Sequence, residues 1–143
     1  MDWKLQLIVL PVSDVDRAKA FYSEKLGFNV DVDYQPNDQF RVVQLTPPGS
    51  ACSITIGKGV SADMTPGSIK GLHLIVTDLE AARAELIGRG VEVSEPVHFV
   101  SGQPVPGVHP ERRDYESFMS LSDPDGNGWM VQEVGRDSPQ ASP

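Results

Sequence analysis

The sequence predicts an α+β fold built from two tandem modules, each with the element order βαβββ. Residues 9–22 (VLPVSDVDRAKAFY) align with residues 73–86 (HLIVTDLEAARAEL), so a strand followed by a helix occurs twice. Each half then ends in two extended stretches joined by a turn rich in Gly and Pro, which is typical of a hairpin. We therefore expect a single domain over residues 1–135, with module one at about 4–59 and module two at about 70–134.

The composition excludes several classes of partner. The chain has 143 residues with 20 acidic and 12 basic side chains, a formal net charge of −8. This acidity, with the basic residues scattered, disfavours binding to nucleic acid or to an anionic membrane surface, and no run approaches the ~20 apolar residues of a bilayer span. The single cysteine, Cys52, excludes an intrachain disulfide, and the N-terminus is unlike a signal peptide, so we expect a cytoplasmic protein. The polar, Pro-rich tail at 136–143 predicts disorder.

Local motifs place the two helices. The sequences SDVD and TDLE predict capping boxes, in which Ser13 and Thr77 are the N-cap residues. An apolar residue recurs at helical spacing behind each box, which predicts one buried stripe per helix. Gly27 and Gly90 stand where the helices should end.

The remaining strands follow from the turn residues. We expect extended stretches at 28–33 and 91–95, and hairpins within 40–57 and 118–134. The second half is longer than the first, and its extra residues fall within 96–116. Because this segment is punctuated by Gly and Pro, it predicts a long surface loop, of the kind that often covers a site.

The motifs VSDVDRAKAFYSEKLGF and SDPDGNGWMVQE, in a repeated βαβββ frame, resemble the vicinal oxygen chelate superfamily of glyoxalases, bleomycin resistance proteins and extradiol dioxygenases. The resemblance covers about residues 4–134. It implies that the two modules form a curved mixed sheet around a small-molecule cavity, often completed by a second subunit, so we expect a homodimer. It does not fix the function, because this scaffold serves both enzymes and binding proteins.

The resemblance also bears on a metal cofactor. Metal-dependent members place four ligands, drawn from His, Glu and Gln, on the first and last strands of each module. The matching positions here are Leu7, Ser53, Gly71 and Met130. None of these is a residue that suits a divalent metal, so we expect no metal cofactor.

Two alternative interpretations retain a metal site or a catalytic role. A displaced site would use His73 and Gln132, which lie two residues beyond Gly71 and Met130 on the same strand faces. His73 is also the one tentative catalytic residue, as a general acid or base near neutral pH. A second alternative places a metal in the long loop, at His98, His109, Glu111 and Asp114.

The expected pocket is mostly apolar with a few hydrogen-bonding groups, which suits an organic ligand. Its candidate ligand-binding residues are Leu7, Val9, Arg41, Gln44, Ser53, Thr55, His73, Tyr115, Phe118, Met130 and Gln132. We place Arg41 at the cavity mouth, where it pairs with an anionic ligand or simply lies at the surface. Three functions stay open: a metal-independent protein that sequesters a hydrophobic or aromatic molecule such as an antibiotic; an enzyme of the superfamily (lyase, isomerase or dioxygenase); and a dimeric scaffold.

Overall fold

The structure is a computed structural model that describes residues 1–136; the predicted disordered tail beyond Arg136 lies outside the described residues. The chain divides into two compact units. Unit 1 holds residues 1–69 together with the short segment 123–127, and unit 2 holds residues 70–122 and the chain from Gly128 onward. Within residues 1–136 no helix is both long and apolar enough to span a membrane.

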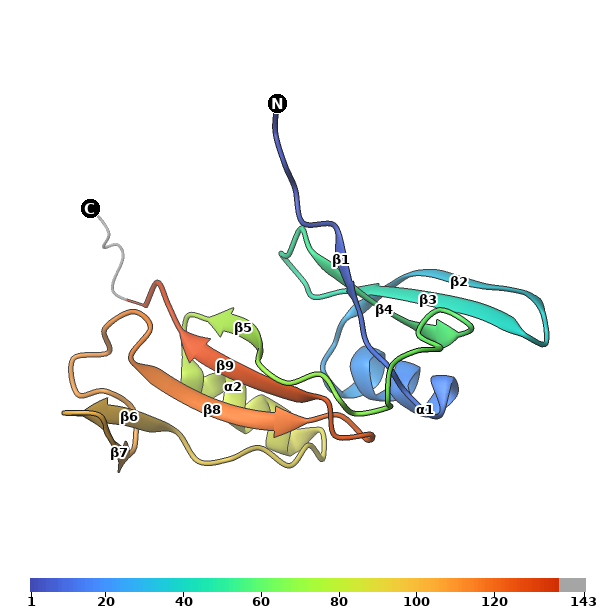
Figure 1. The fold of residues 1–143 in the computed structure, drawn as a ribbon. Coiled ribbons are helices and arrows are strands. Elements are labelled where there is room, and N and C mark those ends of the chain that lie inside the picture. The colour runs from blue at the N-terminus through green and yellow to red at the C-terminus, as the bar shows by residue number, and fades with distance from the viewer. Residues whose placement is uncertain (137–143) are drawn as a thin grey trace. The chain divides into compact units, whose positions relative to one another are not determined.

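Unit 1 contains a four-stranded mixed sheet with one helical segment (Figure 1). Its elements are β1 (Leu7–Val9), α1 (Val15–Ala20), the π-helical turn η1 (Phe21–Lys25), β2 (Asn29–Asn37), β3 (Phe40–Thr46) and β4 (Ser53–Lys58). The strand order is β1-β4-β3-β2, with β1 parallel to β4 and the other pairs antiparallel. This is the βαβββ order that the sequence predicts.

Unit 2 repeats this plan with one additional strand. Its elements are β5 (Leu72–Val76), α2 (Leu79–Gly88), β6 (Val97–Val100), β7 (Gln103–Pro106), β8 (Ser117–Ser122) and β9 (Gly128–Glu133). The strand order is β5-β9-β8-β6-β7, with β5 parallel to β9. The α+β fold class and the two-module organisation are therefore confirmed.

The expected long loop at 96–116 is partly wrong, because it begins with the β6–β7 hairpin. Ser101 and Gly102 both have positive φ, of 51° and 78°, which is the backbone of a two-residue hairpin turn that matches the twist of its strands. The stretch 91–95 is not a strand either, and it contributes a single bridge from Val93 to Leu121.

The helices begin one residue later than the capping-box motifs predict. Asp14 and Asp78 are the N-caps, and each side chain accepts a hydrogen bond from the backbone N–H three residues on, at 3.0 and 3.1 Å. Ser13 is not the cap because its N–H and hydroxyl donate instead to the carboxylate of Asp125. The helix ends are as predicted, since Gly27 and Gly90 have φ of 77° and 81°.

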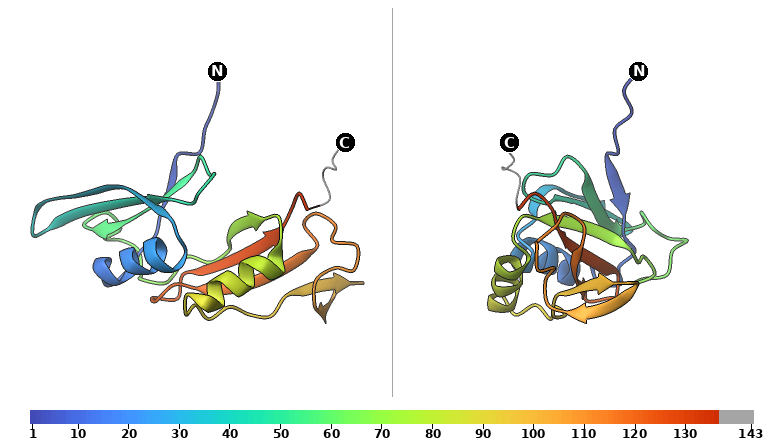
Figure 2. Two further views of the ribbon diagram at one scale, coloured as in Figure 1. Left: turned by 180° about the vertical axis from the view of Figure 1, so that it is seen from behind. Right: turned by 90° about the vertical axis from the view of Figure 1, so that its left-hand side faces the viewer.

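Each helix covers one face of its own sheet, as Figures 1 and 2 show. In unit 1 the buried residues on that face include Val43, Leu45, Ile54 and Ile56, and Ala18 and Tyr22 of the helical segment are buried as well. In unit 2 they include Met119, Leu121, Trp129 and Val131, and Leu79 of α2 is also buried. Because strand side chains alternate, the opposite face of each sheet carries a different set of residues; we call these the open face of unit 1 and the open face of unit 2.

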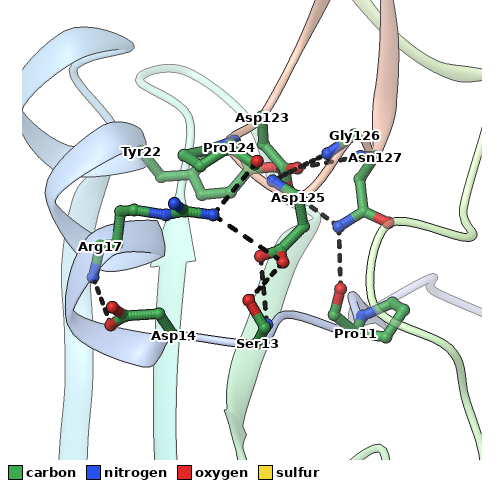
Figure 3. A network of polar contacts seen from close by, with 10 residues as sticks. All are labelled: Pro11, Ser13, Asp14, Arg17, Tyr22, Asp123, Pro124, Asp125, Gly126 and Asn127. Carbon is green, nitrogen blue, oxygen red and sulfur yellow. Dashed lines mark hydrogen bonds and ion pairs between the residues drawn. The ribbon is translucent and has the colours of Figure 1, made fainter.

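A buried carboxylate fixes the turn at 123–127 in unit 1 (Figure 3). Asp123 Oδ1 accepts the backbone N–H groups of Asp125, Gly126 and Asn127 at 2.9–3.0 Å. Its Oδ2 accepts the Tyr22 hydroxyl at 2.7 Å and the Asn127 side-chain amide at 2.8 Å. Five donors therefore converge on one side chain that is 5% exposed.

The neighbouring turn residues hold the chain that leads into α1. Asn127 Nδ2 also donates to the Pro11 carbonyl at 3.0 Å, and the Ser13 hydroxyl donates to Asp125 Oδ1 at 2.5 Å. Arg17 of α1 donates to the Pro124 carbonyl at 3.2 Å. The start of α1 is thus positioned by residues more than a hundred positions later in the sequence.

Asp123→Asn should lower the free energy of unfolding by about 3 kcal/mol, because an amide NH₂ would face donors that now meet a carboxylate oxygen, and buried groups would lose their partners. Urea unfolding followed by circular dichroism measures this. The matched control is Asp38→Asn in the exposed β2–β3 turn, which should change stability by less than about 0.5 kcal/mol. Equal stability of the two variants would contradict the role of Asp123.

Candidate functional site

The open face of unit 1 brings together five of the predicted ligand-binding residues. Leu7 lies opposite Ser53 and Val9 opposite Thr55 in the β1–β4 ladder, and Gln44 lies opposite Thr55 in the β3–β4 ladder. Directly paired residues share a face, so these side chains form one surface. Val32 and Tyr34 extend it along β2, opposite Gln44 and Val42, and both are largely exposed.

A polar row runs across this surface. Gln44 Nε2 lies 3.3 Å from Ser53 Oγ, and Ser53 Oγ lies 2.6 Å from Thr46 Oγ1. The Thr46 hydroxyl donates in turn to Asp31 Oδ2. Beside the row, Thr55 is buried and its Oγ1 has no hydrogen-bond partner among residues 1–136. The open face of unit 1 thus combines apolar side chains with a connected row of three neutral polar groups that ends at the Asp31 carboxylate.

The open face of unit 2 carries the second predicted group. His73 pairs with Met130, and Phe118 pairs with Gln132, so these four side chains share that face. Ile75 lies on the same face and is 61% exposed. The ring of Phe118 also meets that of Phe99 edge-on, with centroids 5.7 Å apart. The surface is mainly apolar and aromatic.

His73 has a defined hydrogen-bonding state. Its Nδ1 lies 2.6 Å from the carbonyl oxygen of Gly71, and a carbonyl only accepts, so Nδ1 carries a proton. In the neutral ring, Nε2 is then the acceptor. The side chain is exposed, so this nitrogen is accessible to a ligand.

Arg41 lies elsewhere. Because side chains alternate along β3, Arg41 lies on the helix side with Val43 and not on the open face with Gln44. Its guanidinium donates to Asp33 at 2.9 and 3.0 Å and to Asp16 at 2.7 Å. These hydrogen bonds raise the pKa of Arg41 and hold the pKa of Asp33 far below its usual value. Because acidic side chains already occupy the guanidinium, Arg41 is not free to pair with an anionic ligand.

Tyr115 sits in the loop before β8 and is exposed, with φ at 65° and its N–H donating to the Glu133 carbonyl at 3.0 Å. The loop is held by Arg112, which donates to the Glu133 carboxylate at 2.7 and 2.5 Å. Glu133 is fully buried and also accepts the Leu79 N–H at 2.8 Å. Burial alone would raise the pKa of Glu133, but Arg112 and this N–H outweigh it and lower that pKa below 4.5.

The four positions that the resemblance assigns to metal ligands do not fit a divalent cation. Leu7 and Gly71 have no donor atom, and Ser53 and Met130 offer a hydroxyl and a thioether where imidazole and carboxylate are preferred. Ser53 is moreover engaged with Thr46 and Gln44.

The loop residues considered as a second metal site do not converge. The rings of His98 and His109 meet edge to face with centroids 5.7 Å apart, and His98 Nδ1 is hydrogen-bonded to the Gly107 carbonyl. Glu111 pairs with Arg113, while Asp114 accepts the Gly135 N–H. Across residues 1–136, no three His, Cys, Asp or Glu side chains are grouped to hold a metal ion.

Sequence reasoning missed two members of the polar row, Thr46 and Asp31. Thr46 was detectable, because it follows Gln44 at the two-residue spacing of one strand face. Asp31 was not, since it lies at an irregularity between Val30 and Val32 that breaks the alternation of β2. A cavity of about 640 Å³ next to the start of α1, bordered by Asp16, Arg41 and Lys58, was also not foreseen.

Comparison with known proteins identifies the family. The model of the glyoxalase/bleomycin resistance protein/dioxygenase superfamily matches residues 4–131. No curated protein matches the chain. Because the family match spans nearly all of the described residues, the chain belongs to this superfamily.

Several solved structures are similar over almost their whole length. TnmS3, an antibiotic binding protein from Streptomyces sp. CB03234, is 33% identical with a TM-score of 0.72, covering 94% of this chain and 98% of its own. A glyoxalase/bleomycin resistance protein from the same Streptomyces strain is 33% identical with a TM-score of 0.68, covering 91% and 100%. A superfamily member from Sphaerobacter thermophilus DSM 20745 is 28% identical with a TM-score of 0.71, covering 92% and 98%.

Glu133→Gln should lower the free energy of unfolding at pH 7 by about 2 kcal/mol, because Arg112 would lose its buried partner. The loss is below that of a fully buried pair since Arg112 keeps contacts to Asp78 and Glu80. The folded pKa of Glu133 is lowered, so its stabilisation is present above pH 4.5 and disappears as the pH falls through the lowered value.

Chemical unfolding of both proteins between pH 3 and pH 8 measures this dependence. The two stability curves should converge at the acidic end. A difference that stays constant from pH 8 to pH 3 would contradict the role of the Glu133 carboxylate.

Proposed function

We propose that this protein binds a small hydrophobic or aromatic organic molecule at its open sheet faces without a metal ion, and that sequestration of an antibiotic is its role. The observation that carries the proposal is the chemistry of the open face of unit 1. Leu7 and Ser53 occupy the positions where a metal site would need imidazole or carboxylate, and apolar side chains, an exposed Tyr34 and hydrogen-bonding groups lie on the same face. The similarity to TnmS3, an antibiotic binding protein, supports it.

The proposal includes a homodimer in the cytoplasm as the working form. The exposed Ile75 on the open face of unit 2 provides apolar surface that a second copy would cover. The lone Cys52 suits a reducing compartment. Light scattering at micromolar concentration tests the dimer.

A ligand should stabilise the protein against unfolding. At a ligand concentration of 100 times Kd the free energy of unfolding rises by about 2.7 kcal/mol, which corresponds to a Tm increase of roughly 8 °C for a chain of this length. A thermal-shift screen of polycyclic aromatic natural products, with simple sugars and amino acids as a control set, measures it. If no compound raises Tm, the dimeric scaffold becomes the better account.

Metal content separates binder from metalloenzyme. We expect less than about a tenth of an equivalent per subunit after dialysis against manganese, iron, nickel and zinc in turn, because the donor set suits none of them. Elemental analysis measures this. One tightly held equivalent that His73→Ala abolishes would instead support the displaced site at His73 and Gln132.

An enzyme of the superfamily is the second candidate, and the accessible Nε2 of His73 favours it, since this nitrogen is placed to take a proton from a ligand. The variant His73→Ala distinguishes the two. A binder keeps its affinity for a stabilising ligand within about tenfold, whereas an enzyme loses turnover of that ligand by roughly a hundredfold or more. Product formation followed by mass spectrometry, with His109→Ala as a control outside the open faces, decides between them.

A further inference from the structure

The polar row on the open face of unit 1 has a fixed direction. A carboxylate only accepts, so the one proton of Thr46 Oγ1 goes to Asp31. Thr46 must then accept from the Ser53 hydroxyl at 2.6 Å, and Ser53 must accept from the Gln44 amide at 3.3 Å. Every donated proton therefore points from Gln44 towards Asp31.

This direction determines what the row presents at its other end. With Nε2 donating to Ser53, the carbonyl oxygen of Gln44 is left as an acceptor, and it receives no hydrogen bond from residues 1–136. Hydrogen bonds in a chain polarise one another, so an amide that donates towards a carboxylate becomes a better acceptor at its oxygen. The Gln44 end of the row thus favours a ligand that donates a hydrogen bond.

Thr55 supplies the second half of the recognition site. It lies directly opposite Gln44 in the β3–β4 ladder and opposite Val9 in the β1–β4 ladder. Thr55 is 5% exposed, and its hydroxyl lacks a hydrogen-bond partner among residues 1–136, which is unfavourable for a buried polar group. Valine would fill the same space without that penalty, so the hydroxyl has no structural use within this chain.

We propose that Gln44 and Thr55 recognise the hydroxyl group of a neutral hydroxylated aromatic ligand, a phenol. This inference rests on the proposed function and names the ligand class for the same surface. The phenol donates to Gln44 Oε1 and accepts from the Thr55 hydroxyl, which a small rotation about the Thr55 side-chain bond or a shift of Gln44 brings to it. The aromatic rings lie along the exposed Val32 and Tyr34 of the same face.

The same chemistry discriminates against related ligands. A methyl ether accepts from Thr55 but has no proton for Gln44. A carboxylate meets the Gln44 oxygen and the negative charge of Asp31 at the end of the row, in a protein of net charge −8. The expected order of affinity is phenol, then methyl ether, then carboxylate.

The test uses three matched probes, 2-naphthol, 2-methoxynaphthalene and 2-naphthoate, titrated into the full-length protein at pH 7 and followed by two-dimensional NMR. We expect 2-naphthol to bind about fivefold more tightly than 2-methoxynaphthalene, as one additional neutral hydrogen bond provides. The ratio should fall to about one in Gln44→Met, because the methyl ether lacks only the hydrogen bond to Gln44. Thr55→Val should keep the ratio but weaken both probes by about fivefold, because both accept from the Thr55 hydroxyl. Both affinities should stay unchanged in Thr65→Val, whose side chain is exposed outside the site. The Tm of Thr55→Val should equal or exceed that of the parent protein.

The outcomes separate this inference from the proposed function. If 2-naphthol and 2-methoxynaphthalene bind equally, or if Gln44→Met keeps the fivefold ratio, the phenol site is wrong while an aromatic-binding surface remains. Unchanged affinity of both probes for Thr55→Val would likewise overturn the inference. A Thr55→Val variant that melts several degrees lower would show that its hydroxyl is structural, and would also overturn the inference. If none of the three probes causes saturable shifts, the proposed function fails and the inference with it.

Discussion

The Asp123 carboxylate is the interaction on which the first unit depends. Three backbone N–H groups, a buried tyrosine hydroxyl and a side-chain amide all donate to it. Through Asn127 and Asp125 the same turn holds Pro11 and Ser13, the residues that lead into α1. Because buried donors without a partner are strongly unfavourable, this geometry allows little variation. The position of the first helix, and hence of the sheet face that it covers, follows from a turn that lies between two strands of the other unit.

Unit 2 also depends on a buried carboxylate, that of Glu133, which pairs with an arginine. Buried Glu133 accepts from the first N–H of α2 and from Arg112, which lies in the loop before β8 with φ at 51°. A non-glycine residue at positive φ is strained, and two charge-assisted hydrogen bonds to a buried carboxylate offset that strain. In each unit, then, a buried carboxylate connects a helical segment to a distant part of the chain: Asp123 accepts from Tyr22 of η1, and Glu133 accepts from the first N–H of α2.

One face of each sheet packs against its helix, so the residues on the opposite face can differ without disturbing that packing. Leu7 and Met130, at two of the positions that the resemblance assigns to metal ligands, lie on these faces and not in the packed core. Members of one superfamily can therefore share this scaffold while the residues on the open faces differ. The polar row from Gln44 to Asp31 lies on such a face, and all of its hydrogen bonds are donated in one direction, towards Asp31.

The sequence by itself determined the repeat, the two helices, the Gly27 and Gly90 helix ends and most of the strands, because these follow from local periodicity and turn chemistry. It also predicted that Leu7, Val9, Ser53 and Thr55 share a face. It missed the β6–β7 hairpin and predicted an extended stretch at 91–95 that is not a strand. Only the tertiary structure decided the partners of individual polar groups. Arg41 was expected near a ligand but pairs with Asp33 and Asp16. Ser13 was expected to be the N-cap of the first helix but donates to Asp125. These pairings depend on which side chains from distant parts of the sequence lie within hydrogen-bonding distance, and the local sequence does not determine that.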